Sequence, residues 1–254
     1  MVTRLFLCML LLASANWTSA ETQARSFDLN GVTELVFDGD ITVKFTQADN
    51  AQAMVTLVKG DWDDVEIKQT KALFKVSGKT GFWNFWGSAN AELEIKISVP
   101  QLSRLEMVGE VDFHGKSLNV GNLEIEMVGA SYAGFSDSLN ADNLDLDITG
   151  ASKFEAHSLN AEAAKIELTG ASNVVVSGSG SIAKLALELT GASNFEAASL
   201  VGQSVIAEAT GASNIELEVS EQLKASLSGA SNLRYGGSPK LNVNTSGASN
   251  VKAY

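Results

Sequence analysis

In the second half of the chain, apolar and polar residues alternate in short segments, and each segment ends at a glycine. Apolar residues stand six, four and two positions before that glycine. A period of two is typical of a strand that buries one face, whereas a helix would place apolar residues three and four positions apart. The pattern predicts strands at Leu123, Ile125 and Met127; Leu144, Leu146 and Ile148; Ala164, Ile166 and Leu168; Leu185, Leu187 and Leu189; Val205, Ala207 and Ala209; and Leu223, Ala225 and Leu227.

These segments belong to a sequence repeat. Gly-Ala-Ser occurs seven times, and Asn follows it in five copies; the copies begin at Gly129, Gly150, Gly170, Gly191, Gly211, Gly229 and Gly247. A fixed period of about 20 residues indicates a repeat architecture and is too short for a four-stranded propeller blade. We therefore predict an all-β, single-domain parallel β-solenoid. An antiparallel meander is the alternative, because alternation does not define strand direction.

Stacking of coils would give the repeated corner a structural role. Equivalent residues of successive coils lie about 4.8 Å apart, so each Asn amide can bond to the Asn of the next coil. We predict a ladder of Asn173, Asn194, Asn214, Asn232 and Asn250.

The first part of the chain has β-rich runs but lacks the regular period. No Pro- or Ser-rich linker separates it from the repeats. We therefore predict one β-solenoid domain over residues 21–254, with irregular β coils over 21–100 and regular repeats over 101–254.

The N-terminus has the features of a secretory signal peptide over residues 1–20. A basic start is followed by a short apolar run and by small residues suited to cleavage after Ala15 or Ala20. The single cysteine, Cys8, lies inside this segment, so we expect no disulfide in the mature chain. No later segment is apolar enough for a transmembrane anchor. We expect an exported protein of the periplasm, the cell surface or the extracellular space.

The balance of basic and acidic residues limits the classes of partner that the chain is suited to bind. The chain has 18 basic and 30 acidic residues, for a net charge of −12. Nucleic acid binding depends on neutralising phosphates, so this balance argues against it. An acidic chain is suited to cations or basic partners.

One acidic residue stands three positions before the glycine in six consecutive repeats. In a solenoid these carboxylates would form a row that binds Ca²⁺ or a basic partner, or simply a solvated face that prevents wrong strand pairing. The residues are Glu106, Glu126, Asp147, Glu167, Glu188 and Glu208. No repeat carries the Asp-x-Asp-x-Asp-Gly spacing of a dedicated calcium loop.

The densest aromatic stretch lies between two glycines. Phe82, Trp83, Phe85 and Trp86 occupy four of five consecutive positions. Such a loop either closes the solenoid core or forms an exposed patch for a partner.

The sequence contains no recognisable catalytic motif. The two histidines, His114 and His157, stand at different positions of their repeats, so we expect them in different rows. No nucleophile elbow, zinc motif or phosphate loop occurs. We therefore expect no catalytic residues, no resident metal and no cofactor.

Several segments together resemble a known family. Phe37 to Gln47, then Leu93 to Val111, then the Gly-Ala-Ser repeats are similar to the auto-transporter adhesin head GIN domain of exported bacterial proteins. The resemblance covers nearly the whole mature chain and implies a right-handed β-solenoid in the cell envelope. It brings no set of active residues.

These observations favour a non-enzymatic interaction or scaffold module of the bacterial envelope, with an unknown protein or polysaccharide as its partner. A carbohydrate-active β-helix enzyme is one alternative, because such enzymes need little beyond carboxylates. A divalent-cation-dependent adhesion surface is the other.

Overall fold

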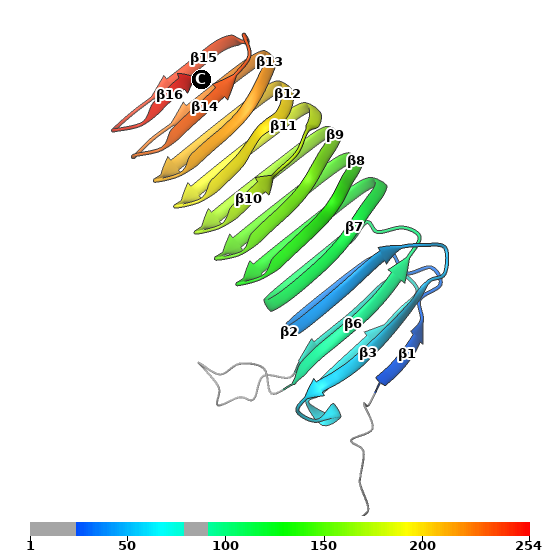
Figure 1. Ribbon diagram of the computed structural model, residues 1–254. Coiled ribbons are helices and arrows are strands. Elements are labelled where there is room, and N and C mark those ends of the chain that lie inside the picture. Colours follow the sequence, from blue (N-terminus) through cyan, green and yellow to red (C-terminus); the bar gives the residue numbers. More distant parts are fainter. Residues whose placement is uncertain (1–23, 79–90) are drawn as a thin grey trace, which may run out of the picture.

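The computed structural model describes residues 24–78 and 91–254. Their alternating segments form strands that pair into one continuous sheet, which winds into a rod of stacked coils (Figure 1). A single 3₁₀ turn, Trp62–Asp64, lies in the described residues. The strands are β1 (Ala24–Asp28), β2 (Glu34–Gln47), β3 (Gln52–Lys59), β4 (Val65–Gln69), β5 (Leu73–Gly78), β6 (Glu92–Val99), β7 (Arg104–Gly129), β8 (Tyr132–Gly150), β9 (Lys153–Gly170), β10 (Asn173–Val176), β11 (Gly180–Gly191), β12 (Asn194–Gly211), β13 (Asn214–Leu227), β14 (Asn232–Gly236), β15 (Lys240–Thr245) and β16 (Asn250–Ala253).

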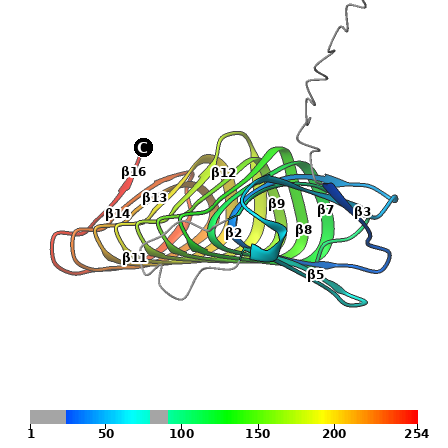
Figure 2. The ribbon, with the colours of Figure 1, turned by 90° about the horizontal axis from the view of Figure 1, so that it is seen from below.

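From β7 to the C-terminus, every strand pair is parallel, and the register follows the repeat except for shifts between the two strand segments of a coil, as at Gly115 and Ser117. Gly129 lies opposite Gly150, and Gly150 lies opposite Gly170. Figure 2 shows the coils following one another as a row of loops from the N-terminal strands to β16. Parallel pairing excludes the meander and confirms the β-solenoid, which has about seven turns.

The corners depend on glycine. Gly191 has a φ of +97°, a conformation that L side chains rarely adopt, and a Cβ there would collide with the carbonyl oxygen of Gly170. The amide of Ala192 donates to that same carbonyl at 2.7 Å. Ser193 is fully buried, and its single hydroxyl hydrogen is shared between the carbonyls of Thr190 and Gly170, at 3.2 and 3.4 Å from the hydroxyl oxygen. The backbone of each corner therefore lies directly on the backbone of the one before.

The inward positions of the strands form one apolar core along the rod. In its N-terminal half, four Phe side chains stack from coil to coil. The ring centroids of Phe45 and Phe113 are 5.3 Å apart, those of Phe113 and Phe135 are 5.9 Å apart, and those of Phe135 and Phe154 are 6.0 Å apart. Such tilted aromatic pairs add stability beyond the area they bury.

The strands before β7 are less regular. The sheet begins in the order β1-β3-β6-β2-β7, and β3 pairs antiparallel with both β1 and β6. Strand β4 also pairs antiparallel, with β5. The irregularity expected for residues 21–100 thus takes the form of antiparallel strands, which lie at the N-terminal end of the rod (Figure 1).

Two sequence-based predictions lie outside the described residues. They are the signal peptide over residues 1–20 and the aromatic stretch with Phe82, Trp83, Phe85 and Trp86. Across residues 24–78 and 91–254, no helix has the length and hydrophobicity needed to cross a membrane.

Candidate functional site

The strand that precedes each glycine corner carries the acidic residues on its outer side. Consecutive members lie opposite one another on neighbouring strands, from Glu126 to Asp147, Glu167, Glu188 and Glu208. We name these five residues the carboxylate row. Glu106 lies next to its first member, because one guanidinium contacts Glu106 and Glu126 together.

Basic side chains neutralise part of the carboxylate row. Arg104 donates to Glu106 at 3.1 Å and to Glu126 at 2.9 Å, and it also pairs with Glu124. Partial burial opposes the charge of Arg104, but the neighbouring carboxylates outweigh it and raise the arginine pKa. Lys165 pairs with Glu167 at 2.7 Å. One end and the middle of the row are therefore ion-paired.

The pKa of Asp147 shows how crowded the row is. Partial burial raises this pKa, and the nearby carboxylates of Glu167 and Asp145 raise it further. Lys165 and the hydroxyl of Thr149 act in the opposite direction but are outweighed. A positive charge that approached this point would relieve the repulsion.

A metal site is not formed by these carboxylates. Within the described parts of the chain, no group of three or more His, Cys, Asp or Glu side chains is arranged to hold a metal ion. Strand spacing explains this, because in-register carboxylates extend outward side by side instead of converging on one point. Their geometry is better suited to an extended partner than to a single ion.

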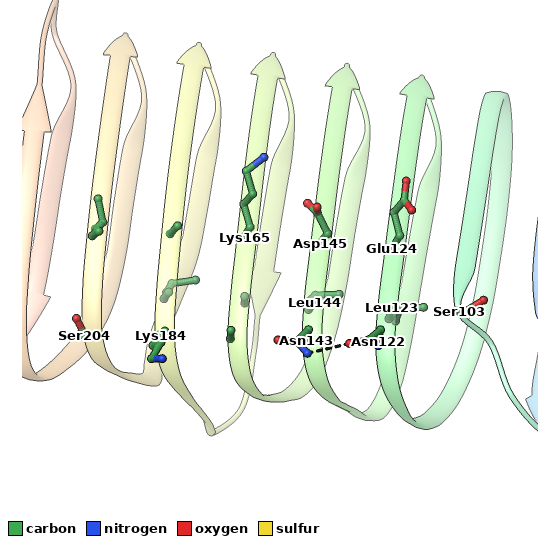
Figure 3. Close-up of a pocket in the computed structure, with 15 residues that line it drawn as sticks. Ser103, Asn122, Leu123, Glu124, Asn143, Leu144, Asp145, Lys165, Lys184 and Ser204 are labelled. Carbon is green, nitrogen blue, oxygen red and sulfur yellow. Dashed lines mark hydrogen bonds between the residues drawn. The ribbon is translucent and has the colours of Figure 1, made fainter.

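Beside the carboxylate row lies a shallow hollow of about 650 Å³ (Figure 3). Asn122 and Asn143 line it on neighbouring strands, next to Ser103, and the amide of Asn143 donates to Asn122 at 2.8 Å. Lys165 and Lys184 stand farther along, and Figure 3 shows the side chain of Lys165 extending along the strand. We name this surface the ladder hollow.

Small residues create the ladder hollow. Ala163 lies between Asn143 and Lys184 in one outward row of side chains. In the next row Ala186 separates Lys165 from Ile206, which is 44% exposed. The result is a surface that combines amides, carboxylates, lysines and apolar patches across several coils.

The asparagines predicted to form a ladder lie on the strand that follows each corner. The amide of Asn194 donates to Asn173 at 2.8 Å, and Asn214 donates to Asn194 at 2.8 Å. Asn232 donates to Asn214 at 3.2 Å, and Asn250 lies opposite Asn232 in register. These bonds connect neighbouring coils, and this asparagine ladder lies outside the ladder hollow.

Sequence reasoning missed a second asparagine ladder. Asn140 donates to Asn119 at 2.6 Å, and Asn160 donates to Asn140 at 2.9 Å. The signal was a Ser-Leu-Asn triplet that ends at each of these three asparagines. It recurs only three times, so the more frequent Gly-Ala-Ser obscured it.

Comparison with known proteins agrees with this architecture. The family model described as "Putative auto-transporter adhesin, head GIN domain" matches residues 31–239 of the chain. No curated protein matches the sequence.

Solved structures share the fold at low sequence identity. A crystal structure of a "putative adhesin" from Parabacteroides merdae has a TM-score of 0.80 at 16% identity and covers 91% of this chain and 95% of its own. A "putative lipid binding protein" from Parabacteroides distasonis has a TM-score of 0.82 at 17% identity and covers 91% of this chain and 96% of its own. At these identities the similarity concerns the fold.

Proposed function

The chain belongs to the auto-transporter adhesin head GIN domain family, and from this premise we propose that it is an exported, non-enzymatic binding module of the bacterial cell envelope. The ligand we propose is an extended polymer, a polysaccharide or a protein segment, that runs along the rod. The surface that would hold it is the ladder hollow with the adjoining carboxylate row.

The observation that carries this proposal is the register of the outward rows. Asn122 and Asn143 lie on neighbouring strands and share a hydrogen bond, and Lys165 and Lys184 continue the polar surface on the next coils. Each of these coils therefore presents one polar group, at the strand spacing of about 4.8 Å, although Lys165 lies in the row beside that of Asn122, Asn143 and Lys184. A polymer with regularly spaced polar groups can meet one such group on each coil.

Ion pairs occupy one end and the middle of the carboxylate row, so the carboxylates there do not form the free pair of a glycosidase. A glycosidase needs one carboxylic acid and one carboxylate held free on either side of the bond that is cleaved. Here Arg104 pairs with Glu106, Glu124 and Glu126, and Lys165 pairs with Glu167. The open stretch of the row at Glu188 and Glu208 is suited to a basic or hydroxylated partner.

Binding to an array of purified polysaccharides and basic peptides tests this function. We expect the full chain to retain at least one polymer. If that polymer is a polysaccharide, the double variant Lys165→Ala, Lys184→Ala binds it at least tenfold more weakly, because each lost charged hydrogen bond costs about 1.5–3 kcal/mol. If it is a basic peptide, the double variant binds it at least as tightly, because two repelling charges are gone. Lys240→Ala removes an exposed lysine on β15, outside the ladder hollow, and serves as the matched control. Cleavage of the bound polymer would overturn the proposal in favour of an enzyme, and the absence of any bound polymer would overturn it altogether.

A further inference from the structure

A second hollow, of about 680 Å³, lies on the strands that follow the glycine corners, between β2, β7, β8, β9 and β10. Both histidines of the chain line it, although His114 and His157 stand in different rows. We name it the tyrosine hollow, after Tyr132. A volume of this size is in the range of sites for small molecules.

Gly134 lies at the base of the tyrosine hollow, beneath the ring of Tyr132. In its outward row Gly134 lies between His114 on one neighbouring strand and Glu155 on the other. Since Gly has no side chain, the two flanking side chains are separated by two strand spacings, or about 10 Å. A Cβ at Gly134 would lie only 2.8 Å from Cζ of Tyr132, so the ring of Tyr132 occupies the space above this glycine.

Tyr132 is held in a fixed position. Its hydroxyl donates to Oε2 of Glu155 at 2.7 Å, and its ring centroid lies 5.3 Å from that of His114. Partial burial raises the pKa of Tyr132 to about 12, together with the hydrogen bond to Glu155 and the charges of Glu155 and Asp112. The hydroxyl therefore remains a neutral donor at any physiological pH, and the ring forms a platform on one side of the hollow.

The charge inside the tyrosine hollow differs from that of the whole chain. Its single lining carboxylate, Glu155, is already paired with Lys153, and the lining Lys44 is paired with Glu94 at 2.9 Å. The side chain of Lys116 forms no hydrogen bond or ion pair with any described residue. In a chain with a net charge of −12, this is a local site with a spare positive charge.

Hydroxyl groups complete the lining. Ser136 and Ser177 border the hollow, and the hydroxyl of Ser177 lies 3.3 Å from Nδ1 of His157. Nearby acidic residues outside the lining are Asp112, beside Tyr132, and Asp137, which accepts a hydrogen bond from Ser117 at 2.7 Å. The hollow thus combines one aromatic face, one free cation and several hydroxyl and imidazole groups.

We propose that the tyrosine hollow binds one acidic sugar unit, of the hexuronate class. The apolar C–H face of a pyranose ring would pack on Tyr132, and its carboxylate would accept hydrogen bonds from Lys116. Glu155, the two serines and the histidines would bond to the ring hydroxyls. This inference goes beyond the proposed function, because it uses other strands and does not require a polymer on the ladder hollow.

Calorimetry with the full chain tests this site, with sodium glucuronate as the ligand and glucose as its neutral counterpart. We expect saturable binding of glucuronate and at least tenfold weaker binding of glucose, which lacks the carboxylate that Lys116 recognises. Lys116→Ala weakens glucuronate binding at least tenfold. Lys224→Ala, which removes an exposed lysine of β13 outside the hollow, leaves it unchanged.

A second variant tests the aromatic platform. Tyr132→Phe retains the ring and removes only the bond to Glu155, so glucuronate still binds, whereas Tyr132→Ala abolishes binding. Thermal unfolding measures whether both variants are folded. If Tyr132→Ala is unfolded, the test depends on Lys116→Ala, which changes an exposed side chain. The proposal is overturned if glucuronate gives no saturable heat, if glucose binds equally well, or if Lys116→Ala and Lys224→Ala bind alike.

Discussion

In the coils from β7 to β13, strands pair parallel with the glycines of successive corners opposite one another, whereas β1, β3 and β4 pair antiparallel at dissimilar residues. Both regions bury their apolar side chains in the same core. In the regular coils the backbone of one corner rests on that of the preceding corner, as Gly191 does on Gly170. In the N-terminal strands, bulky side chains such as Phe27 and Phe74, with ring centroids 5.3 Å apart, provide the contact between elements.

The difference teaches that one fold can set strand register in two ways. Identical corners define register through the backbone and leave the outer surface free to vary. The antiparallel strands lack this corner, so their register follows from the alternation of apolar residues and from the turns between the strands, and a slip of one residue would turn the apolar face outward. The substitutions that follow test this contrast.

Removing a large core side chain from the N-terminal region should have the largest effect. Phe74 is fully buried, and we expect Phe74→Ala to lower the free energy of unfolding by about 3–5 kcal/mol. Chemical denaturation followed by circular dichroism measures this loss. A loss under about 1 kcal/mol would mean that this region does not depend on side-chain size.

Adding a side chain at a corner should be the next most damaging change. Gly191→Val combines a φ of +97° with a collision against the Gly170 carbonyl, and we expect a loss of about 3 kcal/mol. Gly121→Val is the matched control, because the nearest atom to a Cβ there is the Asp142 carboxylate at 3.5 Å. Equal losses in the two variants would show that the corner does not define the register.

Breaking the asparagine ladder should lower the free energy of unfolding by less than either of these changes. Asn194 bonds to the coils on both sides, through Asn173 and Asn214, and we expect Asn194→Ala to lower the free energy of unfolding by about 0.5–1.5 kcal/mol. Asn250→Ala, at the last coil, should cost less than Asn194→Ala in the same denaturation experiment. A larger loss from Asn250→Ala would contradict a role for the interior bonds.

The smallest expected effect depends on pH. Because the folded protein raises the pKa of Asp147, the fold disfavours its ionised form. The stability that the protonated form contributes is present below the unfolded pKa of about 3.9 and is lost as the pH rises through the folded pKa. Asp147→Asn should therefore melt slightly above the wild type at pH 7 and equally at pH 3. A lower melting temperature at pH 7 would contradict the assignment.

The sequence allows much of the regular region to be predicted. The spacing of Gly129, Gly150 and Gly170 indicates both the length of a coil and the residues that lie opposite one another. The antiparallel strands β1 and β3 could not be predicted, because alternation specifies which side is buried and not which way a strand runs.

The candidate surfaces were less predictable than the rows that form them. The carboxylate row follows from the repeat, but the bonds of Arg104 to Glu106 and Glu126 depend on where a long side chain reaches. The tyrosine hollow depends on a missing side chain, at Gly134, and on a ring that lies over it. A residue that departs from its row gives no periodic signal, so such features emerge only in three dimensions.

The stacked corners also make the rod modular. Since Gly191 rests on Gly170 and Gly211 rests on Gly191 in the same way, a whole coil is interchangeable with its neighbour at these points. Duplication or loss of a segment between two such glycines would lengthen or shorten the rod while preserving the contact at the junction. The length of the rod can therefore evolve independently of the residues on its outer surface.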